Sequence, residues 1–193
     1  MIAAFDVHYP GDGRGAAAAV LFSDYRDAEP ASVCSARFCG VADYIAGAFY
    51  RRELPCILAL FARIGRPVDE IIVDGYVMLG KNRPGLGQHL FDKLGAKTPV
   101  IGVAKSMFEG ARPVKVFRGG ARQPLFVTAS GTDVVVAAEK IRFMHGSFRI
   151  PTLLKRVDLL ARRGVLRMQR AGAPIRFADP DVDFGWDWQP DPL

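Results

Sequence analysis

The sequence predicts a mixed α/β sheet with helices on both faces. Three apolar segments come first, and turn residues separate them, as is typical of neighbouring antiparallel strands. After residue 50, amphipathic segments alternate with short apolar ones, which is the order expected of helices that cover parallel strands. Two of the short segments, residues 70–74 and 99–103, have continuous apolar centres, as in strands that are buried on both faces.

The first three segments predict an antiparallel three-strand meander. Residues 1–8 read MIAAFDVH and are followed by the turn YPGDGRG. Residues 16–23, AAAAVLFS, form the second predicted strand, and residues 32–38 form the third, after the break AEP. Strands this close together along the chain are expected to pair with their immediate neighbours.

An amphipathic helix is predicted next. Its apolar positions step by three and four, and Gly65 closes it; these positions are Leu54, Ile57, Leu58, Phe61 and Ile64. We expect Pro55 in the first turn, where its missing N–H costs little. That placement puts Glu53 at the start of the helix.

The second half of the chain continues the alternation. After the strand at 70–74, the predicted elements are a loop at 80–88, a helix at 86–95, strands at 99–103 and 123–129, and helices at 133–146 and 151–164. Gly146 and Gly164 are expected to end the last two helices, and Pro151 precedes the second of them. We predict a single domain over residues 1–176 and an acidic, Trp-containing tail over 177–193.

Charge is unevenly distributed along the chain. The 193 residues carry a formal net charge of +6, yet residues 178–193 hold five aspartates and no lysine or arginine. The remainder therefore carries +11, and a body that basic suggests a polyanionic partner such as nucleic acid. The alternative is an ordinary basic protein with an acidic tail. The tail itself could pack on the body, mimic nucleic acid or dock a partner.

Cysteine usage and hydropathy bear on the compartment. The odd set of Cys34, Cys39 and Cys56, together with the lack of a signal peptide, predicts a reducing, cytoplasmic environment. No apolar run reaches the ~18 residues that a membrane-spanning helix needs.

Three acids stand at unusual places. Asp6 interrupts an apolar strand, Glu53 begins an amphipathic helix, and Asp74 ends a buried strand. Isolated carboxylates at such positions cost desolvation energy, and three brought together repel one another unless a cation neutralises them. Carboxylate oxygens suit Mg²⁺, with Mn²⁺ as a substitute. Each acid taken alone also fits a cap or turn residue.

Lys105 follows the apolar run VIGVA at the end of another predicted strand. A lysine at this place could meet a phosphate or stabilise developing charge. Taken alone, it also fits an ordinary solvated lysine at a strand end.

An ordered set of motifs then carries a family resemblance. FDVHY, DYIAGAFYRRELP, IIVDGY, PGLGQHL and TPVIGVAK are followed by PLFVTASGTDVVVAAEKI and GSFRIPTLLKRVD. In order and spacing this set, which covers about residues 1–160, resembles the endonuclease V family. The resemblance implies a ribonuclease H-like fold and Mg²⁺-dependent cleavage of inosine-containing DNA or RNA at the second phosphodiester 3′ to the lesion.

The resemblance also implies roles for individual residues. Asp6, Glu53 and Asp74 match the metal carboxylates, and Lys105 matches the active-site lysine. The positions that match the nucleic-acid-binding segments are Tyr44, Ile45, Gly47, Gly75, Gly85 and His89. Tyr44 matches the wedge that opens the strand beside the lesion, and the two later glycines match the lining of the base pocket. For His89, a structural hydrogen bond on a helix face is the alternative reading.

The chain departs from the family pattern in three segments. Asp43 and Ala46 stand where the wedge loop usually has prolines. Tyr76 and Val77 follow Asp74-Gly75, where the family often has His or Asn and then Gly, and Gly80 and Lys81 occupy a stretch that usually carries histidine. The late Gly-His that helps bind metal appears as Gly131-Thr132, and the adjacent Asp133 is predicted to cap the following helix. His8 shares a strand face with Asp6 and either assists the site or is structural.

These observations predict a metal-dependent endonuclease with altered or relaxed base specificity. The expected partner is DNA or RNA, single-stranded or lesion-containing. The sequence leaves the oligomeric state open, with a monomer as the default. The competing hypotheses are a catalytically weak or inactive relative that binds nucleic acid, and an interaction protein on the same scaffold. Basic residues between 155 and 176 either extend a phosphate-contacting face or form a solvated helix face.

Overall fold

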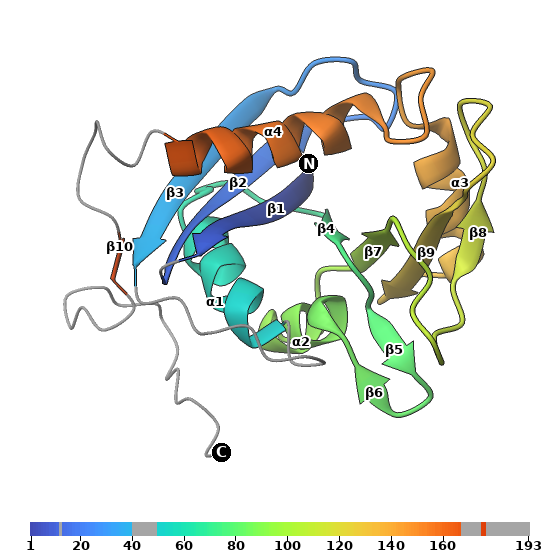
Figure 1. Cartoon of the computed structure of the whole chain (residues 1–193), viewed down its shortest axis with the longest axis horizontal. Coiled ribbons are helices and arrows are strands. Elements are labelled where there is room, and N and C mark those ends of the chain that lie inside the picture. Colours follow the sequence, from blue (N-terminus) through green and yellow to red (C-terminus); the bar gives the residue numbers. More distant parts are fainter. Residues whose placement is uncertain (12, 40–49, 167–174, 177–193) are drawn as a thin grey trace.

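The computed structural model describes residues 1–11, 13–39, 50–166 and 175–176. An eight-stranded mixed sheet runs through the molecule in the order β10-β3-β2-β1-β4-β7-β9-β8 (Figure 1). The strands are β1 (Ile2–Gly11), β2 (Arg14–Phe22), β3 (Ser32–Cys39), β4 (Glu70–Asp74), β7 (Val100–Ala104), β8 (Val114–Val116), β9 (Leu125–Ser130) and β10 (Ile175–Arg176). The predicted tail, 177–193, lies outside the described residues.

The predicted meander is confirmed. β1 pairs antiparallel with β2, and β2 pairs antiparallel with β3. β4 then joins the other side of β1 in parallel, and β7 joins β4 in parallel. The expectation that only parallel strands follow the meander is wrong at the far edge, because β9 pairs antiparallel with β7 and the unpredicted β8 pairs antiparallel with β9.

Helices cover both faces, as predicted (Figure 1). The helices are α1 (Tyr50–Phe61), α2 (Leu86–Lys93), α3 (Val134–Phe143) and α4 (Thr152–Leu166). Along β1, Ala3, Phe5 and Val7 pack with α1 and α2 in one apolar cluster, whereas Ile2 and Ala4 pack with α3 and α4 in another. This strict alternation follows from the two-residue period of a strand, and it fixes which face every later side chain joins.

Three local predictions are corrected by the structure. α1 begins at Tyr50, so Pro55 lies inside the helix and not in its first turn, although Glu53 does lie in the first turn. Part of the predicted loop at 80–88 forms a small hairpin of β5 (Met78–Gly80) and β6 (Arg83–Pro84). α4 continues past Gly164, whose missing side chain permits close packing: a Cβ there would lie 2.9 Å from Cβ of Ala16 on β2.

The described part of the chain contains no helix that is both long enough and apolar enough to cross a bilayer. Cys34, Cys39 and Cys56 are all free thiols.

Candidate nuclease site

Two of the predicted acids are brought together by strand register. β1 and β4 are parallel neighbours, with Phe5 opposite Val73. Asp6 follows Phe5, and Asp74 follows Val73. The two acids therefore lie at the same level of the sheet. Each also stands one residue beyond a side chain of the α1 face, which directs both carboxyls to the face covered by α4.

Lys105 completes this edge of the sheet. It follows β7, which lies next to β4 with Val103 opposite Asp74. Its Nζ donates to Oδ2 of Asp74 at 2.5 Å. Burial lowers the pKa of Lys105, but the neighbouring charge and hydrogen bond of Asp74 outweigh burial and raise it. The lysine therefore stays protonated and supplies a positive charge among the acids.

Glu53 approaches from the other side of the sheet. It lies in the first turn of α1 and is only 4% exposed. Burial, followed by the charges of Asp6 and Asp74, raises its pKa well above the ordinary value, and Arg52 opposes that rise only in part. The charges of both strand acids therefore act on Glu53.

A fourth acid, Asp158, belongs to the same site and was not predicted. It lies on α4 over the sheet and borders the same cleft as Asp6. Arg162, one turn further along α4, donates to both of its oxygens, at 2.9 and 3.1 Å. Burial raises the pKa of Asp158, but the hydrogen bonds and charge of Arg162 outweigh burial and lower it. In the sequence, this pair is indistinguishable from a common i,i+4 ion pair on a solvated helix face.

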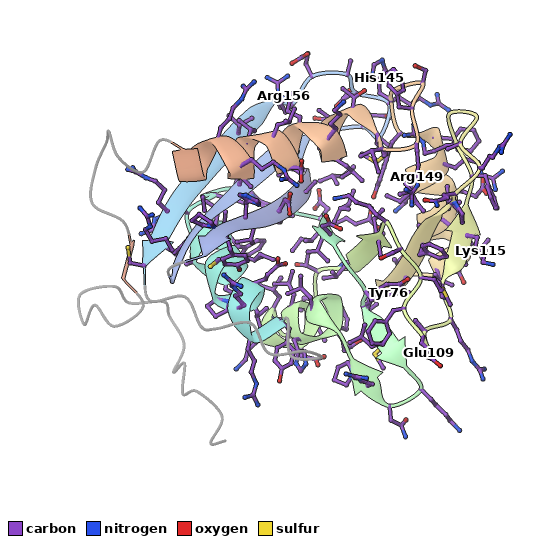
Figure 2. The ribbon with its side chains drawn as sticks, in the orientation of Figure 1. Tyr76, Glu109, Lys115, His145, Arg149 and Arg156 are labelled. Carbon is purple, nitrogen blue, oxygen red and sulfur yellow. The ribbon has the colours of Figure 1, made fainter. Side chains whose placement is uncertain are left out.

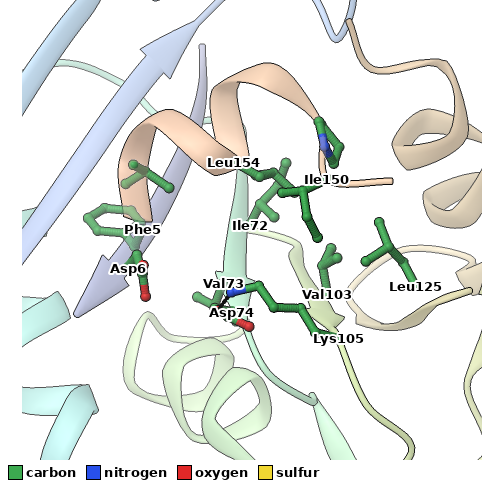
Figure 3. A pocket seen from close by; sticks show the side chains of 12 residues that line it. Phe5, Asp6, Ile72, Val73, Asp74, Val103, Lys105, Leu125, Ile150 and Leu154 are labelled. Carbon is green, nitrogen blue, oxygen red and sulfur yellow. Dashed lines mark hydrogen bonds and ion pairs between the residues drawn. The ribbon is translucent and has the colours of Figure 1, made fainter. Parts of the chain in front are cut away.

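The effect of this arrangement on a carboxyl pKa is clearest at Asp6. Burial, followed by the charges of Asp74 and Asp158, raises its pKa from 3.8 to about 7. Behind the strand acids lies a small cavity of about 30 Å³, walled by apolar side chains such as Ile72, Val103 and Leu154 (Figure 3). These walls exclude water from one side of the carboxyls, and removing solvent disfavours the charged form of an acid.

The acids border one large cleft of about 660 Å³. Strand ends, the first turn of α1, α4 and the segment after β7 all contribute to its walls, as expected for a site at the carboxyl ends of parallel strands. The charged residues that line it are Asp6, Arg52, Glu53, Asp74, Lys105, Asp158 and Arg162. Apolar and aromatic side chains form a further part of its lining, with Tyr76, Leu79, Met107 and Phe108.

The donor set suits a hard divalent cation, because it consists of desolvated carboxylates that repel one another. Within the described residues, however, no three His, Cys, Asp or Glu side chains converge closely enough to hold an ion together. Lys105 occupies the position beside Asp74. The chemistry of the residues therefore fits a metal. In this structure, Lys105 provides the positive charge that compensates the acids.

Comparison with known proteins identifies the family. The family model for endonuclease V matches residues 1–143. The chain belongs to the endonuclease V family. An endonuclease V from Xanthomonas oryzae pv. oryzae is 28% identical over 200 residues, which covers 92% of this chain and 82% of the relative. An endonuclease V from Nostoc is 31% identical over 124 residues, covering 64% and 55%.

Solved structures of endonuclease V share the fold. The enzyme from Streptomyces avermitilis superposes with a TM-score of 0.72 at 28% identity, covering 87% of this chain and 82% of that one. The Ciona intestinalis endonuclease V, solved in complex with DNA containing an inosine followed by a ribo-adenosine, gives a TM-score of 0.73 at 18% identity, covering 86% of each chain. The expected ribonuclease H-like mixed sheet of this family is confirmed.

The pocket glycines expected from the family pattern both line the cleft. Gly75 has φ +136°, a conformation that side-chain-bearing residues rarely adopt. A Cβ on Gly85 would lie 2.5 Å from the carbonyl oxygen of Tyr76, so only glycine allows the two backbone segments to approach this closely. Both glycines therefore shape the turn that carries the chain away from Asp74.

The two residues that depart from the family pattern behave differently. Val77 is fully buried and does not border the cleft, because its side chain packs toward Gly87 in the core. The bulk of Val77 therefore does not narrow the cleft. Tyr76 does border the cleft, although only 7% of it is exposed.

Other predicted positions lie away from the acids or outside the described residues. His89 is on α2, where its ring stacks on Tyr50 with centroids 3.7 Å apart, and it does not border the cleft. His8 does border the cleft, and burial followed by the charge of Arg162 lowers its pKa. Tyr44, Ile45 and Gly47 of the expected wedge loop, with Asp43 and Ala46, lie outside the described residues.

The expectation that Gly131-Thr132 occupies a metal position is wrong for this structure. Ser130 pairs with Val100 at the start of β7, whereas Asp74 pairs with Val103 near its end, so residues 131–132 lie at the opposite edge of the sheet. A Cβ on Gly131 would meet Phe91 and Pro99. The predicted cap is confirmed, because the Asp133 side chain accepts from the N–H groups of Val135 and Val136.

Proposed function

We propose that this protein is a metal-dependent endonuclease that hydrolyses phosphodiester bonds in nucleic acid beside deaminated bases, with inosine as the reference lesion. The observation that carries the proposal is the meeting of Asp6, Asp74, Glu53 and Asp158 with Lys105 in one cleft. Similarity to endonuclease V along most of the chain supports it. Burial, followed by the charges of neighbouring acids, raises the pKa of both Asp6 and Glu53, and such shifts are common where carboxyls gather at a functional site.

The residues that would hold the cation are Asp6, Asp74 and Glu53, with Asp158 as a further oxygen donor. Mg²⁺ is the proposed ion, and Mn²⁺ is its proposed substitute. When bound, the cation would stabilise charge on the phosphate and lower the pKa of a water molecule. Lys105, which stays protonated beside Asp74, is placed to stabilise charge that develops on a phosphate oxygen.

The acids differ in charge near neutral pH before a cation binds. The pKa of Asp6 is raised to about 7, and a bound cation would favour its ionised form. Asp158 is held ionised by the Arg162 fork. Arg162 itself borders the cleft with about half of its side chain exposed, so it also offers a positive group to the backbone of a nucleic acid.

The aromatic part of the cleft lining is proposed to receive the base. Taking a base out of its stack costs a few kcal/mol, and stacking on an aromatic ring offsets part of that cost. Phe108 and Tyr76 provide rings 6.2 Å apart, and Met107 is half exposed beside them. The Tyr76 hydroxyl is already engaged with the protein backbone. Recognition by stacking on these walls would favour an altered or relaxed base preference.

A second candidate is a nucleic-acid-binding relative with weak or no cleavage. The observation that favours it is the lack of any three converging metal-ligating side chains among the described residues. In that case the basic rim of the cleft would still hold nucleic acid in a salt-sensitive manner.

One assay separates the two candidates. The purified protein is incubated with Mg²⁺ or Mn²⁺ and labelled single strands that carry inosine, uracil, an abasic site or no lesion, and with inosine-containing RNA. Scission one nucleotide beyond inosine supports the proposed function, and scission at several lesions supports relaxed specificity. Salt-sensitive binding without scission on any strand would reject the nuclease and retain the second candidate. Comparison of matched DNA and RNA strands shows which polymer is cut.

A further inference from the structure

The segment that carries Lys105 belongs to no helix or strand. After β7 ends at Ala104, the residues at 105–108 follow the wall of the cleft without ladder hydrogen bonds of their own. All four residues border the cleft, and Met107 is half exposed. A segment of this kind is placed by contacts from other parts of the chain. The position of Lys105 therefore depends on what fixes the backbone around it.

Arg149 fixes the start of this segment. It lies in the loop between α3 and α4 (Figure 2), and one of its guanidinium nitrogens donates to the carbonyl oxygen of Lys105. The same nitrogen donates to the carbonyl oxygen of Pro124, just before β9, at 2.8 Å. One side chain thus joins the end of β7, the approach to β9 and the loop before α4.

The loop that carries Arg149 is itself braced. Arg118, only 9% exposed, donates to the carbonyl oxygens of Met144 at 2.5 Å, Gly146 at 2.9 Å and Phe148 at 2.9 Å. A Cβ on Gly119 would lie 2.4 Å from the carbonyl carbon of Phe148, so the two backbones are in close contact. Arg149 therefore projects from a fixed support.

Tyr76 fixes the rest of the segment from the other side. Its hydroxyl donates to the carbonyl oxygen of Ser106 at 2.7 Å and accepts from the N–H of Phe108 at 3.1 Å. Both hydrogen-bonding capacities of the hydroxyl are used on one short stretch of backbone. Tyr76 comes two residues after Asp74, so this contact links the segment after β7 to the turn after β4 (Figure 2).

We propose that Arg149 and Tyr76 are positioning residues for the reaction: they fix the backbone at 105–108 and thereby hold Lys105 against Asp74. The inference rests on the proposed nuclease function, because Lys105 acts there on the phosphate. Neither side chain needs to contact the substrate for this task. The Tyr76 ring remains a wall of the cleft, and its hydroxyl is the positioning group.

Two conservative variants isolate the positioning contacts. Tyr76→Phe keeps the ring and removes both hydroxyl hydrogen bonds, and we expect kcat to fall about three- to tenfold, in line with the net value of a neutral hydrogen bond. Arg149→Lys keeps the charge and loses the planar guanidinium, and we expect a fall of about tenfold or more, because charged hydrogen bonds are stronger. KM should change less than about twofold in both, since binding contacts are intact.

Matched controls exist elsewhere in the fold. Tyr25→Phe removes a tyrosine hydroxyl that donates to Glu70 at 2.5 Å at the opposite end of β4. Arg156→Lys makes the arginine-to-lysine change at a residue that pairs with the exposed Glu29. Neither residue borders the cleft. Both controls should cleave at the wild-type rate.

The decisive experiment combines steady-state cleavage of an inosine-containing strand, over a range of strand concentrations, with amide hydrogen exchange in the free protein. Support consists of faster exchange at 105–108 in Tyr76→Phe and Arg149→Lys, with lower kcat and nearly unchanged KM. Folded variants with unchanged exchange in this segment, or with raised KM and unchanged kcat, would overturn the proposal. If Arg149→Lys does not fold, Tyr76→Phe decides alone. If the wild-type protein cuts nothing, the proposed function fails, while the exchange arm still tests the positioning contacts.

Discussion

Replacing Asp6 with asparagine should abolish cleavage and yet stabilise the protein at alkaline pH. Asn has almost the same shape, and its Oδ1 can still accept from the N–H of Val7, a contact of 2.9 Å in the native protein. The change removes a carboxyl whose pKa is raised from 3.8 to about 7, mainly by burial and then by Asp74 and Asp158. The ionised Asp6 carboxylate destabilises the folded state but not the unfolded state.

The magnitude follows from linkage. Because the folded pKa exceeds the unfolded one, the native state binds more protons between pH 3.8 and about 7, and stability falls as pH rises through that window. Each pKa unit corresponds to about 1.4 kcal/mol, so complete ionisation of Asp6 in the folded protein would cost about 4 kcal/mol. Solvent in the cleft screens part of this, so we expect Asp6→Asn to raise the free energy of unfolding by about 2 kcal/mol at pH 8.

The assay is urea unfolding at pH 5 and pH 8, with and without millimolar Mg²⁺. The gain from Asp6→Asn should be clearly larger at pH 8, and Mg²⁺ should stabilise the wild-type protein more than the variant at pH 8. Asp92→Asn is the matched control, since Asp92 is exposed on α2, and it should change stability by less than about 0.5 kcal/mol. Equal effects of Asp6→Asn at the two pH values would refute the electrostatic reasoning.

Three further predictions follow from named contacts. Arg162→Ala should lower the cleavage rate about tenfold, because it removes the hydrogen bonds that hold Asp158. The control Arg163→Ala, at the next and exposed position, should have little effect. Similar losses in both variants would point to a diffuse charge effect. Gly102→Ala should destabilise the fold by about 2 kcal/mol or more in thermal unfolding, because its Cβ would lie 2.6 Å from the carbonyl oxygen of Gly75; a variant as stable as the wild type would contradict this close approach. Asp133→Ala should cost about 1 kcal/mol of stability through the lost cap while leaving cleavage intact, and a loss of cleavage in the folded variant would place this edge of the sheet in the site after all.

The strand acids were predictable because periodicity and position coincide in them. Asp6 interrupts one apolar run and Asp74 ends another, and the parallel register of the two strands brings these residues to the same level of the sheet. Glu53 was predictable as the acid that opens an amphipathic helix, even though the predicted place of Pro55 was wrong by a full turn. These residues owe their positions to elements that the sequence pattern determines locally.

Other members of the site depend on packing that the sequence does not reveal. In the sequence, Asp158 resembles one half of a surface ion pair. Only the packing of α4 against β1 and β2 brings it to the site. Thr132 follows a predicted strand just as Asp74 does, and only the antiparallel direction of β9 sends it to the opposite edge. The roles of Tyr76 and Arg149 come from hydrogen bonds to residues about thirty to forty-four positions away along the chain. No local pattern encodes contacts of that range.

The most direct test of the central claim is cleavage of an inosine-containing strand by the wild-type protein and by Asp74→Asn, in Mg²⁺ and under single-turnover conditions. Asp74→Asn keeps the shape of the residue and removes the charge that pairs with Lys105. We predict Mg²⁺-dependent scission by the wild type and none by Asp74→Asn, with Asp92→Asn at the wild-type rate. Equal scission by Asp74→Asn, or a wild-type protein that binds the strand and never cuts it, would contradict the account.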